Sequence, residues 1–187
     1  MSKGLVHLYT GDGKGKTTAA LGLSLRALGA GYEVYFFQFM KKGDSSEFRI
    51  LESLEGVHCA HFGTGRFIRK GKPDEDSRLE IESNRKGFET VLRIFDSFNN
   101  ETSKDPHHPQ GKRLVVLDEL CLLLFFDIVS LEEALELVRA KPESVELVIT
   151  GRRAPDELVE LCDYVSEIKE RKHPYQKGVQ AREGIES

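Results

Sequence analysis

Short apolar runs alternate along this chain with longer segments whose apolar residues recur at helical spacing. The apolar runs predict β-strands over residues 5–9, 34–39, 57–62, 114–117, 147–149 and 164–168. Helices are predicted over 17–28, 78–98 and 130–140, and a further short helix is predicted to begin at Pro155. Alternation of this kind is typical of a mostly parallel central sheet with helices on both faces. We therefore expect an α/β fold.

The helix ends and the main loop have their own local signals. The helix over 17–28 is followed by Gly29 and Gly31, and Ser130 with Glu133 has the spacing of a capping box. The apolar residues of 78–98 fall on one face of a long helix. The polar stretch 99–112 contains two prolines and a glycine, so we predict an exposed loop there.

Composition narrows the class of protein. The chain has 187 residues with a net charge of -4, which favours one domain over 1–187 and argues against a general binder of nucleic acid or anionic membranes. The three cysteines, Cys59, Cys121 and Cys162, are far apart and form no CxxC motif, which indicates a reducing compartment. We find neither a signal-peptide pattern nor an apolar stretch of about 18 residues, so we expect a cytoplasmic protein without membrane spans.

The strongest chemical signal is a glycine-rich loop between the first predicted strand and the first predicted helix. Its residues are Gly11, Asp12, Gly13, Lys14, Gly15, Lys16, Thr17 and Thr18. A loop of this kind directs backbone N–H groups and a helix N-terminus at phosphate, while Lys16 reaches a phosphate and the Thr17 hydroxyl binds Mg²⁺. The motif departs from GxxxxGK[ST] at Thr10, where a glycine is usual. A dinucleotide-binding GxGxxG reading fits poorly, since it needs a glycine at Lys16.

Two other strand ends carry candidate site residues. Asp118 and Glu119 follow the apolar run 114–117 and are candidate Mg²⁺ ligands, because a hard cation prefers oxygen. Arg152 follows the run 147–149, where it is either a phosphate clamp or one half of a solvated arginine pair. On residue pattern alone, Arg26 reads as a surface charge. The sequence predicts a solvated loop at His107-His108 and a structural turn at His173-Pro174-Tyr175.

Taken together, these segments resemble the P-loop ATP:corrinoid adenosyltransferases over nearly the whole chain. The resemblance rests on the loop 10–20, on Arg26-Ala27, Gln38-Phe39, Leu117-Asp118-Glu119-Leu120 and Ile149-Thr150-Gly151-Arg152, and on the C-terminal segments 163–167, 172–175 and 177–179.

The resemblance implies a RecA-like P-loop NTPase fold and a homodimer. It further implies transfer of the 5′-deoxyadenosyl group of ATP to the cobalt of a reduced corrinoid, such as cob(I)alamin or a corrinoid precursor, with release of tripolyphosphate. Residues 11–17 would wrap the triphosphate, Thr17 and Glu119 would hold Mg²⁺, and Arg26 and Arg152 would contact phosphates. A reductase or flavodoxin-type electron donor is the expected partner.

The corrinoid side matches the family less well. Some members carry Phe-x-Trp after the residues matching Thr64-Gly65, where the aromatics displace the lower cobalt ligand. This chain has Arg66-Phe67-Ile68 and no tryptophan, so Phe67 is the candidate partial substitute.

The expected reaction agrees with the residue inventory. Cobalt(I) is itself a strong nucleophile, so the protein need not supply a Ser, a Cys or a general base. Lys16 and Arg152 are the candidate catalytic residues, because they would stabilise charge on the leaving triphosphate. The alternatives are a P-loop ATPase or small-molecule kinase, in which Glu119 would polarise water, and a non-catalytic nucleotide switch.

Overall fold

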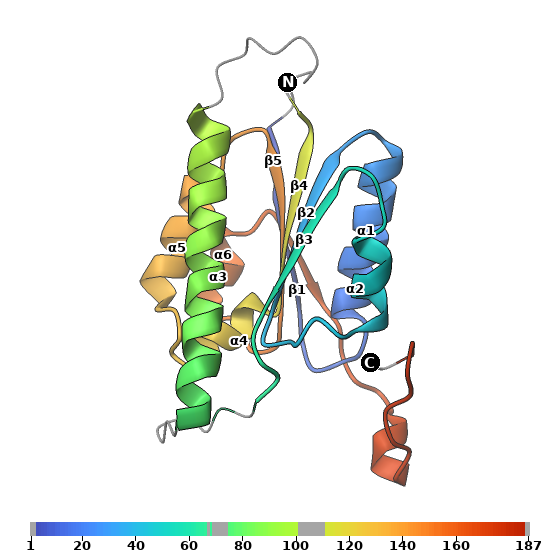
Figure 1. Ribbon diagram of the computed structural model, residues 1–187. Coiled ribbons are helices and arrows are strands. Elements are labelled where there is room, and N and C mark those ends of the chain that lie inside the picture. The colour runs from blue at the N-terminus through green and yellow to red at the C-terminus, as the bar shows by residue number, and fades with distance from the viewer. Residues whose placement is uncertain (1–2, 67, 69–74, 101–110, 186–187) are drawn as a thin grey trace.

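One parallel sheet forms the centre of the molecule. The computed structural model describes residues 3–66, 68, 75–100 and 111–185, and Figure 1 shows the arrangement of the elements. Within these residues the strand order is β3-β2-β4-β5-β1-β6, and every neighbouring pair is parallel. The strands are β1 Val6–Thr10, β2 Glu33–Phe39, β3 Val57–Phe62, β4 Arg113–Asp118, β5 Val145–Thr150 and β6 Tyr164–Glu167.

Helices cover both faces of the sheet, as predicted. α1 (Lys16–Gly29) and α2 (Ser46–Leu51) lie on one face, while the other face carries α3 (Glu75–Asn100), α4 (Leu120–Phe125), α5 (Leu131–Ala140) and α6 (Asp156–Leu161) (Figure 1). A 3₁₀ helix, η1 (Pro174–Lys177), follows β6. None of the described helices is both long and apolar enough to cross a membrane.

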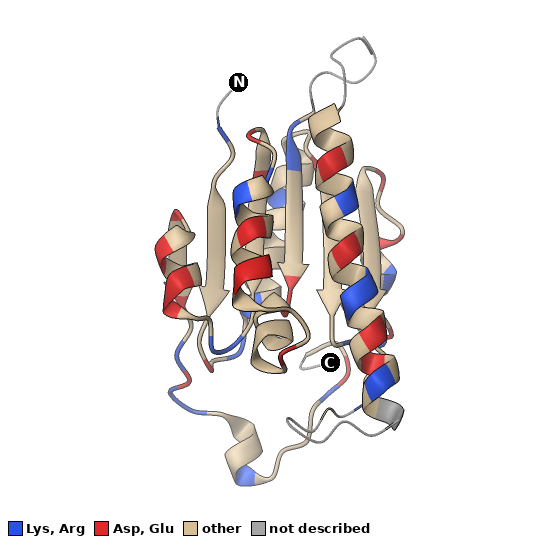
Figure 2. Ribbon diagram, turned by 90° about the vertical axis from the view of Figure 1, so that its left-hand side faces the viewer, with Lys and Arg blue, Asp and Glu red and all other residues tan. Residues whose placement is uncertain are grey.

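The buried strands explain why the central sheet reads as apolar runs. Every residue of β4 is buried, because helices exclude water from both of its sides. On one of those sides α3 packs Phe88, Val91 and Phe95, all at most 1% exposed, into the larger core cluster. Figure 2 shows that Lys, Arg, Asp and Glu gather on the helices and at the strand ends, and are sparse along the strands.

Several local predictions are confirmed, with shifts of a few residues at the ends. α1 ends at Gly29, and Gly31 has a φ of 79°. The capping box is present at the start of α5: the Ser130 hydroxyl accepts from the Glu133 N–H, and the Glu133 carboxylate accepts from the Ser130 N–H. A hydrogen bond from Arg85, together with those from Ser130, lowers the pKa of Glu133 to about 2.

The short helices α2 and α4 were not predicted. Each has six residues, too few for a helical period to emerge from the pattern of apolar positions. Most of the loop predicted over 99–112, including His107-His108, lies outside the described residues.

The parallel topology determines where a site can form. Because all six strands run the same way, their carboxyl ends meet at one edge of the sheet, the lower edge in Figure 1. The glycine-rich loop follows β1 at this edge, and Asp118 ends β4 there. Binding sites of open α/β sheets form at such edges.

Candidate active site

The glycine-rich loop is fastened to the chain that leaves β6. Gly13 N–H donates to the carbonyl of Ile168 at 2.7 Å, and Ile168 N–H donates to the carbonyl of Thr10 at 2.8 Å. A Cβ added to Gly11 or Gly13 would lie 2.5 or 2.7 Å from the Ile168 oxygen. The close approach of a second stretch of backbone therefore requires glycine at positions 11 and 13, whereas Gly15 has open space around it and a φ of 120°.

Lys16 is the first residue of α1, and its ammonium group lies against the backbone of the glycine-rich loop. Its Nζ donates to the carbonyls of Gly11 at 2.7 Å and Gly13 at 2.8 Å, and the residue is only 6% exposed. Burial lowers the pKa of Lys16, partly opposed by the nearby charge of Glu119. The ammonium thus lies where the helix N-terminus also favours an anion.

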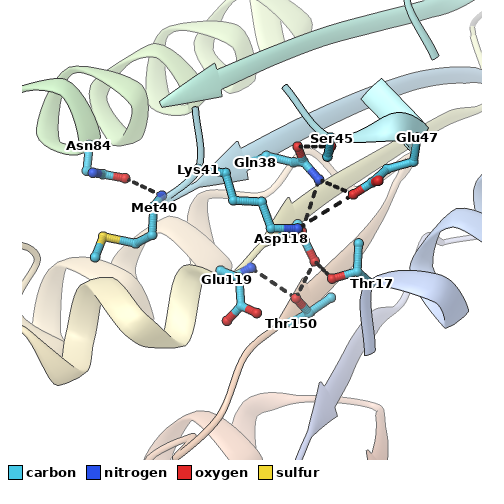
Figure 3. Close-up of polar contacts among 10 residues, drawn as sticks. All are labelled: Thr17, Gln38, Met40, Lys41, Ser45, Glu47, Asn84, Asp118, Glu119 and Thr150. Atoms are coloured by element: carbon cyan, nitrogen blue, oxygen red, sulfur yellow. Dashed lines mark hydrogen bonds and ion pairs between the residues drawn. The ribbon is translucent and has the colours of Figure 1, made fainter. Parts of the chain in front are cut away.

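Asp118 is a buried carboxylate that accepts four hydrogen bonds (Figure 3). Its Oδ1 accepts from the hydroxyls of Thr17 at 2.9 Å and Thr150 at 2.7 Å. Its Oδ2 accepts from Lys41 Nζ at 3.1 Å and from Gln38 Nε2 at 3.5 Å. Asp118 therefore joins the ends of β2, β4 and β5 to the first turn of α1.

Lys41, just beyond β2, supplies the positive charge opposite Asp118. It also lies 3.7 Å from the carboxylate of Glu47 in α2. Burial alone would lower the pKa of Lys41, but the charge of Asp118, the hydrogen bond to it and Glu47 together raise the pKa. Hydrogen bonds from its own backbone, from Gln38 and from Ser45, with the charge of Lys41, outweigh burial and lower the pKa of Glu47. Both side chains are thus held in their charged forms.

Glu119 differs from Asp118 in having an unsatisfied oxygen. Its Oε2 is the one buried side-chain polar atom in the described part of the chain without a hydrogen-bond partner. Its backbone takes the left-handed conformation, with φ 65°, and its N–H donates to the Thr150 hydroxyl at 2.9 Å. The pKa of Glu119 is raised chiefly by burial and, to a smaller extent, by the neighbouring charge of Asp118. An orphaned buried carboxylate oxygen is a natural ligand for a cation.

A cavity of about 1120 Å³ opens beside these groups. It is lined by residues 13–18 of the loop, by Glu119, and by the C-terminal residues 173–175, 179–181 and 183–185. Five basic side chains line it, namely Lys14, Lys16, Lys41, Lys42 and Arg152. This arrangement, with a phosphate-binding loop, clustered cations and an orphaned carboxylate, suits a polyphosphate nucleotide with its metal ion and leaves room for a second substrate.

Comparison with known proteins identifies the family. The family model described as ATP:corrinoid adenosyltransferase BtuR/CobO/CobP matches residues 2–187. The chain belongs to the ATP:corrinoid adenosyltransferase family. The corrinoid adenosyltransferase of Escherichia coli K12 is 33% identical over 184 residues, covering 98% of this chain and 86% of the relative. The corrinoid adenosyltransferase CobA of Salmonella typhimurium LT2 is 32% identical over 192 residues, with the same coverages.

Solved structures confirm the expected fold class. The cytoplasmic domain of the type VII secretion ATPase EccC from Thermomonospora curvata superposes with a TM-score of 0.55 at 16% identity. The match covers 92% of this chain but only 21% of that one, so the chain spans about a fifth of that protein. The likeness shows that this adenosyltransferase family member has the α/β fold of P-loop ATPases.

The structure brings together most of the residues expected to form the site. Residues 13–18, Glu119 and Arg152 line the cavity, and Asp118 lies directly behind Thr17. Gly11 lies at the back of the loop, where its carbonyl accepts from Lys16, and Asp12 is exposed; neither lines the cavity. Arg26, also a described residue, is exposed in the last turn of α1 and likewise lies outside the cavity lining.

The two adjacent arginines after β5 have different environments. Arg152 lines the cavity, whereas the guanidinium of Arg153 lies 4.2 Å from the ring centre of Phe125 on α4. Figure 1 shows α4 on the sheet face opposite α1. On the corrinoid side, Ile68 is buried in the core cluster, and Phe67 lies outside the described residues.

Sequence reasoning did not assign roles to Lys41, Glu47 and Thr150. Lys41 and Thr150 bind Asp118 directly, and Glu47 in α2 lies 3.7 Å from Lys41. The three residues are distant from Asp118 in the sequence, so their partnership exists only in the folded chain. A weak signal was present for Lys41, because a lysine immediately past an apolar strand lies at the same edge as the phosphate-binding loop.

Proposed function

We propose that ATP binds with its triphosphate along the loop 11–18, of which residues 13–18 line the cavity, and that a reduced corrinoid occupies the remaining space of the cavity. ATP-dependent adenosylation of corrinoids is the activity of the family to which this chain belongs. The observation that supports this placement best is the buried Lys16 within the glycine loop, which lines a cavity that is much larger than a triphosphate needs.

The proposed reaction is one displacement at the 5′ carbon. An electron pair of cobalt(I) forms the cobalt–carbon bond, the bond between C5′ and the triphosphate oxygen breaks, and its electron pair leaves on tripolyphosphate. The protein therefore needs to position two substrates and to stabilise the leaving charge. Holding two reactants in the correct orientation can lower the activation free energy by roughly 7–11 kcal/mol.

The basic side chains that line the cavity are suited to stabilising the charge of the leaving triphosphate. Lys16 Nζ donates hydrogen bonds to two loop carbonyls, and we propose that it exchanges them for phosphate oxygens when ATP binds. Arg152 has a planar fork of donors that can hold two phosphate oxygens at once. Preorganised donors of this kind typically contribute factors of about 10²–10³ in rate each.

The residues present also fit Mg²⁺, which we propose as the metal ion. Glu119 offers the orphaned Oε2, and the Thr17 hydroxyl lies beside Asp118. The described residues contain no group of three or more His, Cys, Asp or Glu side chains that could hold a metal by themselves, so phosphate oxygens would supply further ligands. Mg²⁺ bound there would neutralise part of the triphosphate charge.

The two carboxylates would then have separate roles. Asp118 is saturated by donors from the protein, so we propose that it orients Thr17 and Lys41 and that Glu119 is the direct ligand. This refines the sequence-based expectation, which allowed either carboxylate to bind the metal.

We further propose a cytoplasmic homodimer that receives electrons from a reductase or flavodoxin-type protein. The three free cysteines support a reducing compartment. The exposed Tyr164 and Val165 on the edge strand β6 support a subunit interface. The electron donor is proposed from the chemistry alone, because the reaction consumes cobalt in its reduced state.

The direct test is anaerobic incubation with ATP, Mg²⁺ and chemically reduced cobalamin, followed by the optical spectrum. We expect the bands of cobalt(I) to be replaced by those of an alkylated, light-sensitive corrinoid. Loss of cobalt(I) that proceeds equally without ATP would contradict the proposal.

A further inference from the structure

A cluster of buried polar groups lies on α3, away from the phosphate-binding loop. Glu80 and Asn84 are both 0% exposed, one helical turn apart. Asn84 Nδ2 donates to Glu80 Oε1 at 2.9 Å and to the Glu80 carbonyl at 2.8 Å. Buried polar side chains are costly unless their hydrogen bonds are made, so this pair calls for an explanation within the fold.

Glu80 holds the loop that follows β3. Its Oε2 accepts from Thr64 N–H at 2.5 Å, from the Thr64 hydroxyl at 2.6 Å and from Arg66 N–H at 3.4 Å. The approach is close enough that a Cβ on Gly63, whose φ is 129°, would lie 2.6 Å from Glu80 Oε1. Gly65, within the same loop, lines the cavity.

Asn84 holds the loop that follows β2. Its Oδ1 accepts from Met40 N–H at 2.8 Å (Figure 3). Met40 has a φ of 59°, a left-handed conformation that is unfavourable for a non-glycine residue and needs support from its surroundings. The next residue is Lys41, whose ammonium reaches Asp118.

We propose that Glu80 and Asn84 form one buried latch that positions two walls of the cavity, Lys41 through Met40 and the loop 63–66 through Thr64 and Arg66. Neither latch residue lines the cavity, so both are positioning residues. The inference rests on the proposed function for its kinetic consequences, but the hydrogen bonds it invokes are independent of that function.

The two arms of the latch should affect different steps. The backbone of the phosphate-binding loop is fastened to Ile168, whereas residues 64 and 66 are fastened to Glu80, so loosening 63–66 should leave ATP binding intact. The second substrate, which shares the cavity with Gly65, should bind more weakly. Loss of the Asn84 bond should instead act through Lys41 and hence through Asp118.

Glu80→Gln tests the first arm. The amide places a donor opposite Asn84 Nδ2 and weakens the charge-assisted bonds to the loop, so we expect KM for the corrinoid to rise about tenfold and KM for ATP to change less than twofold. Hydrogen–deuterium exchange at Thr64 and Arg66 should accelerate. Arg85→Met is the matched control on α3, since Arg85 contacts Glu133 and the Ile128 carbonyl instead of either loop.

Asn84→Leu and Lys41→Met test the second arm as a double-mutant cycle. If Asn84 acts through Lys41, the loss of kcat in the double variant should be close to that of Lys41→Met alone; a purely structural role predicts that the losses multiply.

The latch is overturned if Glu80→Gln leaves amide exchange at 64 and 66 unchanged, if it raises both KM values equally as a general destabilisation would, or if the cycle is additive. An inactive wild-type protein would refute the proposed function instead. The exchange measurement on Glu80→Gln and Arg85→Met would still decide the latch.

Discussion

Replacing Glu119 by Gln should stabilise the fold when no nucleotide or Mg²⁺ is added. It should also raise the Mg²⁺ concentration that the activity requires. The carboxylate is buried with an unpartnered oxygen, and its pKa is raised chiefly by burial and then by Asp118, so the charged form is disfavoured in the fold. Gln has nearly the same shape but no charge. Removing a buried charge whose hydrogen bonds are incomplete should raise the free energy of unfolding by about 1–2 kcal/mol. For a chain of this size that corresponds to an increase in Tm of roughly 2–8 °C.

The pH dependence of this gain has a definite sign. A carboxyl group whose folded pKa is raised makes the protein lose stability as pH rises from the unfolded value, about 4.3, through the raised folded value. The advantage of Glu119→Gln over the wild type should therefore be largest at neutral pH and should disappear in acid, where Glu119 is protonated in both states.

Glu47→Gln is the matched control, because Glu47 lines the same cavity but has its pKa lowered by its hydrogen bonds and by Lys41. It should destabilise the protein at neutral pH. Differential scanning fluorimetry without nucleotide, from acid to neutral pH, measures both variants, and a Mg²⁺ titration of activity measures the metal effect. A Glu119→Gln protein that melts at or below the wild-type temperature at neutral pH would show that the buried carboxylate does not destabilise the fold, and an unchanged Mg²⁺ midpoint would exclude Glu119 as a metal ligand.

Three further changes test other parts of the structure. Lys16→Ala should lower kcat/KM by about 10²–10³ with the fold retained by circular dichroism, and near-normal turnover would exclude its phosphate role. Gly13→Ala places a Cβ 2.7 Å from the Ile168 carbonyl and should abolish the ATP binding measured by calorimetry. Gly22→Ala is the control: its Cβ would enter open space, so it should raise Tm by the equivalent of about 1 kcal/mol. Equal effects of the two variants would contradict the close approach at Gly13. Ser130→Ala removes the capping box and should lower stability by about 1 kcal/mol in urea unfolding, and an unchanged midpoint would show the cap to be dispensable.

Sequence reasoning succeeded where the structural cause lies within a short stretch of chain. The glycine loop, the capping box and the buried strand before Asp118 each depend on neighbouring residues, so each could be predicted from its local pattern. It failed for α2 and α4, whose six residues are shorter than two helical turns.

The site was harder to predict where contacts between strands decide the role of a residue. Which of Asp118 and Glu119 is free to bind a metal depends on donors from Lys41 and Thr150, both distant in sequence. The Glu80–Asn84 latch likewise depends on two loops meeting on one helix. Arg26 follows Lys16 by ten residues on a straight helix, a rise of about 15 Å, and this distance explains its place outside the cavity lining.

We propose that the loop 11–18 holds all three phosphates so that they leave together. Phosphorus NMR of the products, after anaerobic reaction with ATP and cobalt(I) corrinoid, tests it most directly. We expect tripolyphosphate in a one-to-one ratio with adenosylated corrinoid. ADP with orthophosphate as the main phosphorus products would indicate hydrolysis at the γ-phosphate and would contradict it.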